Sequence, residues 1–179
     1  NDVIGSLVGG GATSMINKAY KHLKLNVPQN KMEQMVSDFL EFYYKNCDKK
    51  SHLYPSVYKT LQILKPKFKI ALCTNKKQHL TEKILKSFKI DGFFDFVLGS
   101  NTDLKLKPNT EMLEYCLKQC GADNENSIMI GDSNNDIIPA KKLSMKSIFV
   151  LYGYGDNSES FQADYVIDTF KKVIEILKS

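Results

Sequence analysis

Residues 127–136 read Ser-Ile-Met-Ile-Gly-Asp-Ser-Asn-Asn-Asp, and this stretch decides the class of fold. Its apolar run ends at Gly131-Asp132, and a helical pattern follows from about residue 137. A short apolar run that leads through a polar turn into a helix is typical of a parallel strand covered on both faces. Asp132 and Asp136 lie four residues apart in the turn. Such carboxylates suit Mg²⁺, although an Asp in this place could also simply cap the helix.

The same alternation of strands and helices extends from this stretch along most of the chain. Further strands are predicted at residues 69–73, 96–99, 147–150 and 165–167. Helices are predicted at about 55–65, 77–88, 110–119, 137–143 and 170–177. This alternation predicts an α/β fold with a doubly wound parallel sheet. Sites in such sheets lie beyond the carboxyl ends of the strands.

Two other strand ends carry polar groups. Thr74-Asn75 follows the run at 69–73, and a hydroxyl with backbone amides at a helix start can hold a phosphoryl oxygen. Both residues are also good helix caps. Lys107 precedes Pro108, which favours extended backbone at the lysine. Each signal alone has a structural explanation, but the three strand ends together predict a phosphate site with a bound cation.

These residues, in this order, resemble the second, third and fourth motifs of the haloacid dehalogenase superfamily. The motifs are Thr74-Asn75, Lys107-Pro108 and Gly131-Asp132-Ser133-x-x-Asp136. The resemblance covers essentially the whole chain and implies an Mg²⁺-dependent phosphatase that works through a phosphoaspartyl intermediate. It implies phosphate binding by Thr74, Asn75 and Lys107, catalytic roles for Lys107 and Asp136, metal binding by Asp132, and support from Gly131 and Ser133.

Three features resemble the phosphoglycolate phosphatase branch of that superfamily: Val8-Gly9-Gly10-Gly11-Ala12, the Gly-Asp-Ser-x-Asn-Asp form of the last motif, and Gly153-Tyr154-Gly155. A further segment, Leu53-Tyr54-Pro55-Ser56-Val57, resembles the return of the chain from the cap to the core. The resemblance implies a small phosphorylated substrate, with phosphoglycolate favoured. A nucleotidase, a pyrophosphatase and a sugar phosphatase remain alternatives, whereas the last motif is less similar to that of a phosphoglucomutase.

The first fifty residues have helical periodicity throughout and no strand pattern. They resemble the cap that this superfamily inserts after its first motif. We therefore predict a small helical cap domain over residues 1–51, with part of its N-terminal side missing, and an α/β core over 52–179. Residues 9–13 are expected to contribute cap contacts to the substrate.

The first motif of the superfamily, Asp-x-Asp-x-Thr on an early strand, has no counterpart in these residues. The closest pattern, Asp91-Gly92-Phe93-Phe94-Asp95, has the wrong spacing and is interpreted as a turn. We expect a segment of a few dozen residues to precede Asn1. Without it the chain is predicted to be inactive, to lack a central strand, and to fold poorly because an apolar slot stays open.

Two alternatives belong to other classes of protein. A non-catalytic relative that binds phosphate esters or a protein would explain the absent nucleophile. A receiver-like signalling domain shares the doubly wound layout, but the helical segment of fifty residues argues against it.

Composition excludes several other classes. The net charge is +5, but its lysines are spread along the chain, so no nucleic-acid partner is predicted. No apolar run is long enough for a membrane span, and no signal peptide is apparent. The 4 cysteines form no Cys-x-x-Cys pair, which favours a reduced, cytoplasmic protein. Oligomeric state is not predicted.

Overall fold

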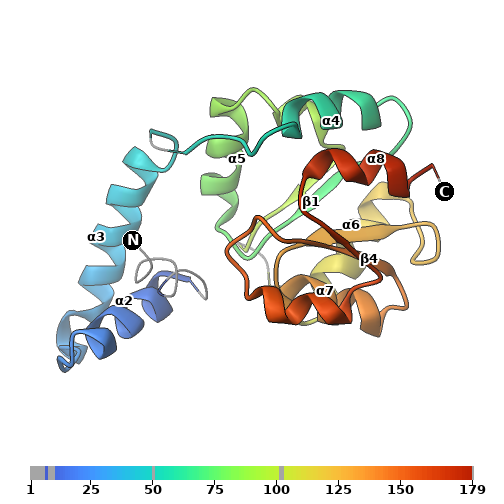
Figure 1. Ribbon diagram of the computed structural model, residues 1–179. Coiled ribbons are helices and arrows are strands. Elements are labelled where there is room, and N and C mark those ends of the chain that lie inside the picture. Colours follow the sequence, from blue (N-terminus) through green and yellow to red (C-terminus); the bar gives the residue numbers. More distant parts are fainter. Residues whose placement is uncertain (1–6, 8–10, 50, 101–102, 179) are drawn as a thin grey trace. The chain divides into compact units, whose positions relative to one another are not determined.

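The computed structural model describes residues 7, 11–49, 51–100 and 103–178 (Figure 1). The chain divides into two compact units, Asn1–Ser51 and His52–Ser179. No helix among the described residues has the length and apolar character needed to cross a membrane.

The first unit is helical, as its periodicity predicts. It contains α2 (Gly11–His22), the 3₁₀ turn η1 (Gln29–Lys31) and α3 (Met32–Asn46). Helices α2 and α3 contact each other, and the Tyr20 hydroxyl lies 3.8 Å from the Met35 sulfur. The segment expected to form substrate contacts, 9–13, is only partly described. Gly9 and Gly10 lie outside the described residues, while Gly11 begins α2.

The second unit alternates strands and helices, which confirms the predicted α/β class. Its strands are β1 (Ala71–Cys73), β2 (Phe96–Leu98), β3 (Ile128–Gly131), β4 (Lys146–Val150) and β5 (Tyr165–Ile167). Its helices are α4 (Val57–Leu64), α5 (Gln78–Ser87), α6 (Glu111–Cys120), α7 (Asn134–Lys142) and α8 (Val173–Ile176). The 3₁₀ turns η2 (Asp91–Phe93), η3 (Asn157–Gln162) and η4 (Phe170–Lys172) complete it.

Every strand pair is parallel, and the described strands form two sheets, whereas the predicted layout was one parallel sheet lacking its central strand. One sheet has the order β1-β2 and the other has the order β3-β4-β5. A cavity of about 1160 Å³ lies between them and is lined by residues of both β1 and β3. The two sheets are separate because no strand among the described residues bridges them.

Helices cover both faces of the strands, and side chains alternate between the faces with the period of two that a strand imposes. In Figure 1, α4 and α8 lie on one side of the strands and α7 on the other. Ile128 and Ile130 of β3 pack with the cluster containing Leu64 and Val173, from α4 and α8. Met129, between them, packs with the cluster formed by residues of α6 and α7.

Helix α7 begins at Asn134, three residues earlier than the predicted start at 137. The polar turn after β3 is therefore shorter than expected, and Asp136 lies in the first turn of the helix. An acidic side chain in that position interacts favourably with the helix dipole.

Candidate active site

The structure joins the carboxyl ends of β1 and β3 through one buried ion pair. The Lys107 Nζ donates to Asp136 Oδ1 at 2.6 Å and to the backbone carbonyl oxygen of Cys73 at 2.7 Å. The side chains of Lys107 and Asp136 are 7% and 10% exposed. A lysine so deeply buried is rare unless its charge is paired. The pair therefore holds a cation at the place where both strands end.

Asn75 fixes the backbone of Lys107 from the neighbouring loop. Its Oδ1 accepts from the Lys107 backbone N–H at 3.0 Å, and its Nδ2 donates to the Lys107 carbonyl oxygen at 2.8 Å. Both polar atoms of the Asn75 side chain are thus engaged with Lys107. The Asn75 backbone amide and the second N–H of its Nδ2 remain as donors for a phosphate oxygen.

Thr74 lies directly after β1, and its backbone N–H donates to the carbonyl oxygen of Leu98 in β2. Its Oγ1 accepts from the Lys76 backbone N–H at 3.1 Å. The hydroxyl therefore stabilises the turn after β1. Its own proton can be donated to a further acceptor, such as a phosphoryl oxygen.

Asp136 links Lys107 to the turn after β3. Its Oδ2 accepts from the Asp132 backbone N–H at 3.2 Å and from the Ser133 hydroxyl at 3.3 Å. Gly131 allows this approach, because a Cβ at that position would overlap the Asp136 carboxyl group. Gly131 and Ser133 thus shape the turn around Asp136, and the side chain of Asp136 orients Lys107.

Asp132 is oriented by the loop that follows β4. Its Oδ2 accepts from the backbone N–H of Tyr154 at 2.7 Å and from that of Gly155 at 3.3 Å. The start of α7 is held by a carboxylate as well, since Glu159 Oε2 accepts from the Asn134 backbone N–H at 2.7 Å. The turn after β3 is therefore fixed from both β4 and η3.

Tyrosines surround Asp132. The rings of Tyr54 and Tyr152 lie 4.8 Å apart between centroids. Burial, followed by the negative charges of Tyr54 and Asp132, raises the pKa of Tyr152 to about 12. Burial also raises the pKa of Tyr54, which interacts with Tyr154. Both Tyr54 and Tyr152 therefore keep their hydroxyl protons near physiological pH.

The carboxylates fit a divalent cation only in part. Mg²⁺ is commonly bound through one or two carboxylates together with water and phosphate oxygens. Asp132 fits that role, whereas Asp136 is engaged with Lys107. Among the described residues no cluster of three or more His, Cys, Asp or Glu side chains could hold a metal ion. Asp132 is therefore the residue of the described site that would hold the cation, with water and phosphate oxygens as further ligands.

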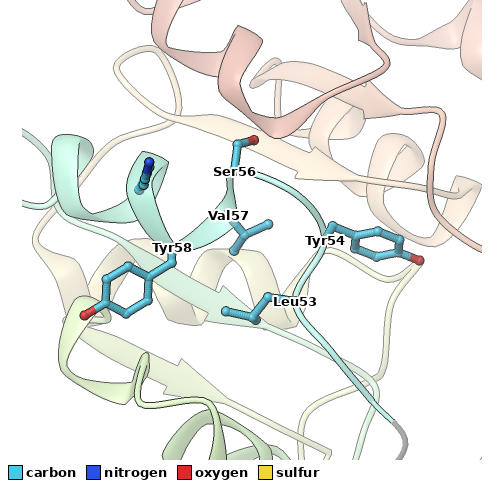
Figure 2. A pocket seen from close by; sticks show the side chains of 6 residues that line it. Leu53, Tyr54, Ser56, Val57 and Tyr58 are labelled. Carbon is cyan, nitrogen blue, oxygen red and sulfur yellow. The ribbon is translucent and has the colours of Figure 1, made fainter.

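A smaller hollow of about 430 Å³ lies at the start of α4 (Figure 2). Figure 2 shows Tyr54 and Tyr58 pointing to opposite sides of this segment, with Leu53 and Val57 between them. The buried Ser56 Oγ has no hydrogen-bond partner in the described part of the chain. None of the predicted site residues lines this hollow, so it is distinct from the phosphate site.

Several site neighbours were not predicted from the sequence. Glu159 reaches the start of α7 through tertiary folding, without a motif of its own. For Cys73 the sequence predicted only that the thiol is reduced. In the structure a hydrogen bond with Cys116 and the nearby charge of Lys107 lower the pKa of the Cys73 thiol. The sequence did offer the Gly153-Tyr154-Gly155 pattern, which the structure places against Asp132.

Comparison with known proteins agrees with this geometry. The family described as haloacid dehalogenase-like hydrolase matches residues 11–150. A phosphoglycolate phosphatase of Colwellia psychrerythraea is 31% identical, over 99% of this chain and 81% of the relative. A pyrophosphatase PpaX of Halalkalibacterium halodurans is 32% identical, over 82% of this chain and 70% of the relative.

Solved structures agree as well. A predicted phosphoglycolate phosphatase from Haemophilus somnus superposes with a TM-score of 0.90 at 27% identity, covering 98% of this chain and 81% of that one. A putative phosphatase from Clostridium difficile gives a TM-score of 0.82 at 28% identity, covering 96% and 80% of the two chains. This chain belongs to the haloacid dehalogenase-like hydrolase family, among its phosphatases.

Proposed function

We propose that this protein contributes to an Mg²⁺-dependent phosphatase that hydrolyses a small phosphate monoester through a phosphoaspartyl intermediate. The observation that carries the proposal is the buried Lys107–Asp136 pair at the joined ends of β1 and β3. A paired, oriented ammonium group is suited to a phosphoryl group, whose transfer is catalysed mainly by positioning and by charge.

Each residue of the site has a defined part in this proposal. Lys107 neutralises phosphoryl oxygens, and Asp136 and Asn75 position Lys107. The Thr74 hydroxyl and the Asn75 backbone amide bind the remaining phosphoryl oxygens. Asp132 would hold Mg²⁺, which when bound supplies positive charge beside the phosphate and the nucleophile. The carbonyl of Cys73 keeps the Lys107 ammonium at the end of β1.

The nucleophile of the proposed reaction is an aspartate of an Asp-x-Asp pair, which these 179 residues do not contain. Its carboxylate would attack phosphorus in line, and the second aspartate would protonate the leaving oxygen and then activate water. The 179-residue chain alone is therefore predicted to lack activity. We also propose that the helical unit acts as the cap and that the protein is cytoplasmic.

Phosphoglycolate is the favoured substrate, because curated phosphoglycolate phosphatases match nearly the whole chain. Pyrophosphate is the second candidate, since two curated pyrophosphatases are 30% and 32% identical to this chain. Either small anion would be attracted by the positive charge of Lys107.

The test compares the 179-residue chain with a longer chain. The longer chain carries, before Asn1, a segment of a few dozen residues that contains an Asp-x-Asp-x-Thr motif. Phosphate release from phosphoglycolate and from pyrophosphate is measured with Mg²⁺ and with a chelator. We expect release only from the longer chain with Mg²⁺, and a loss of about 100-fold or more in Asp132→Asn.

The matched control for that variant is Asp123→Asn, which makes the same change in an exposed turn hydrogen-bonded to Asn126. It should retain full activity. Unchanged activity of Asp132→Asn in the longer chain would contradict the proposal, and a longer chain that binds phosphate esters without hydrolysis would favour the binding-protein alternative.

A further inference from the structure

We propose that Tyr54 is a positioning residue for the cation, because its side chain braces the loop after β4 whose backbone amides orient Asp132. The role of the cation rests on the proposed function, whereas the brace itself rests on the contacts of Tyr54. The inference extends the site to residues 52–56, the stretch through which the chain enters the second unit and reaches α4.

The first observation is that the loop after β4, residues 151–155, needs support from outside. These residues form turns and bends, and Tyr154 is 75% exposed. Even so, the Tyr154 backbone N–H donates to Asp132 Oδ2 at 2.7 Å, and that of Gly155 donates at 3.3 Å. Fixing an exposed stretch of this kind costs conformational entropy, so its position depends on the side chains that hold it.

The second observation is that Tyr152 links this loop to both the core and Tyr54. Tyr152 packs against the buried cluster that contains Leu64, Val150 and Val173. Its ring also meets the ring of Tyr54, with 4.8 Å between the centroids and 57° between the planes. Tilted pairs at this separation are favourable arrangements of aromatic rings. Tyr54 therefore covers the residue that anchors the loop.

The third observation is a second contact of Tyr54 with the same loop. The side chain of Tyr54 hydrogen-bonds with that of Tyr154, so Tyr54 contacts the loop on both sides of Gly153. Gly153 cannot supply a stabilising side chain itself, because a Cβ there would overlap the side chain of Asp132. Support for the loop has to come from a neighbouring segment, and the stretch 52–56 provides it through Tyr54.

These contacts predict an effect on the cation that is separate from substrate binding. Partners that orient a metal ligand typically change metal affinity by about 10–100-fold when they are removed. Thr74 and Lys107 are held by other contacts, with the Lys76 backbone and with Asp136. Loss of Tyr54 should therefore raise the Mg²⁺ concentration that the enzyme needs and leave the KM for the phosphate ester unchanged.

Hydrogen exchange of the 179-residue chain, followed by NMR, tests the brace without any reaction. In Tyr54→Ala the amides of Tyr154 and Gly155 should exchange about tenfold faster. Tyr54→Phe keeps the ring pair with Tyr152 and loses only the hydroxyl, so it should recover most of the protection. Circular dichroism checks that each variant is folded.

Tyr58→Ala is the matched control, because it removes a tyrosine ring from the same segment. Figure 2 shows Tyr58 pointing to the side opposite Tyr54. Its ring pairs with Phe93 at 5.2 Å between centroids, and 46% of Tyr58 is exposed. Tyr58→Ala should leave the exchange of the Tyr154 and Gly155 amides unchanged.

The longer chain described above tests the effect on the cation. In Tyr54→Ala the Mg²⁺ concentration for half-maximal phosphate release should rise about tenfold, and the calorimetric Kd for Mg²⁺ should rise equally. The KM for phosphoglycolate at saturating Mg²⁺ should stay constant. Tyr54→Phe and Tyr58→Ala should resemble the unmodified chain in both measurements.

The outcomes separate this inference from the proposed function. If the longer chain hydrolyses no phosphate ester, the proposed function fails, and hydrogen exchange with the calorimetric Kd for Mg²⁺ still decides the role of Tyr54. Unchanged exchange in Tyr54→Ala, equally fast exchange in Tyr58→Ala, or an unchanged Kd for Mg²⁺ would each overturn the inference. If Tyr54→Ala does not fold, Tyr54→Leu replaces it, since leucine keeps an apolar side chain without the ring or the hydroxyl.

Discussion

Lys107 is held at both ends, its backbone by Asn75 and its ammonium group by Asp136 and the Cys73 carbonyl. At the scale of single residues this arrangement matters because a buried ammonium group is costly without a partner. The same contacts that keep the lysine charged also aim it at the ends of the two strands. Stability and function of this residue are therefore coupled.

Removing the partner of the ammonium group should be strongly destabilising. Asp136→Asn leaves Lys107 buried without a carboxylate, and the free energy of unfolding should fall by about 3–5 kcal/mol in urea denaturation. The double variant Lys107→Met with Asp136→Leu should recover most of that loss, since no unpaired charge remains.

The matched control for the buried pair is Lys172→Ala, which breaks the exposed ion pair with Asp168. Its urea midpoint should be unchanged within error, because exposed pairs contribute little. An equal loss in Lys172→Ala and Asp136→Asn would contradict the role assigned to burial.

The loop after β4 is the element that shapes the site most closely. Gly153 and Gly155 let this loop approach Asp132, and its backbone amides donate to the Asp132 carboxylate. Main-chain donors from a loop anchored on a buried strand fix the carboxylate more rigidly than a flexible side chain would. The element therefore positions the proposed metal ligand.

Adding one methyl group to this loop should disturb the site. In Gly155→Ala the new Cβ would overlap the backbone carbonyl oxygen of Asp132, and we expect a loss of about 1–3 kcal/mol in stability. Gly92→Ala is the matched control, because its Cβ would meet no atom within 4 Å. Circular dichroism during urea denaturation measures both variants, and equal stability of the two would refute the close approach.

The connection between β4 and β5 predicts a pH dependence. Asp164 Oδ2 accepts from the Ser147 hydroxyl and backbone N–H, each at 2.8 Å, and these bonds lower the pKa of Asp164 below its ordinary 3.8. The folded state thus binds fewer protons than the unfolded state in this range. The contribution is fully present above the ordinary pKa and is lost as pH falls through the folded pKa.

Asp164→Asn should accordingly be less stable than the unmodified chain at about pH 6, and the difference should shrink by about pH 3. Urea denaturation of both proteins at the two pH values measures it. The other titrating groups contribute equally to the free energy of unfolding of both proteins, so their contributions cancel when the two free energies are subtracted. A difference that grows on acidification would show that the sign is wrong.

At the scale of the whole molecule, the described strands of the second unit form two parallel sheets that share helices and are not paired with each other. The sheet containing β4 is well buried, whereas β1 and β3 border the cavity. Local stability in proteins follows burial and hydrogen bonding, so it should differ between these strands.

Hydrogen exchange of the 179-residue chain should reveal this difference. Amides of Ile148 and Phe149 in β4 should exchange slowest, and those of β1 should exchange at least tenfold faster. Mass spectrometry of peptides covering the two strands measures the rates. Equal protection of the amides of β1 and β4 would mean that the cavity between β1 and β3 is closed in solution.

The sequence by itself determined the fold class and the family. Continuous apolar runs alternating with helical patterns predicted parallel strands covered on both faces, and the order of Thr74, Lys107 and Asp132 indicated the family that the comparisons confirm. These signals are local, since the spacing of apolar residues and the choice of turn residues are determined within a few positions of the chain. The predicted start of α7 was wrong by three residues. A polar turn and the first turn of a helix contain the same kinds of residue, so a local pattern does not separate them.

Only the tertiary structure decided which groups meet. The Asn75 side chain holds Lys107 across 32 positions of sequence, a contact that no local pattern predicted. Tyr54 comes beside Tyr152 from another part of the chain. The sequence predicted a missing central strand, but only the tertiary structure decided which strands border the open slot, because pairing depends on which edges face each other. Contacts between residues far apart in the sequence are set by packing and loop closure, and neither produces a repeating pattern of residues that could be recognised in the sequence.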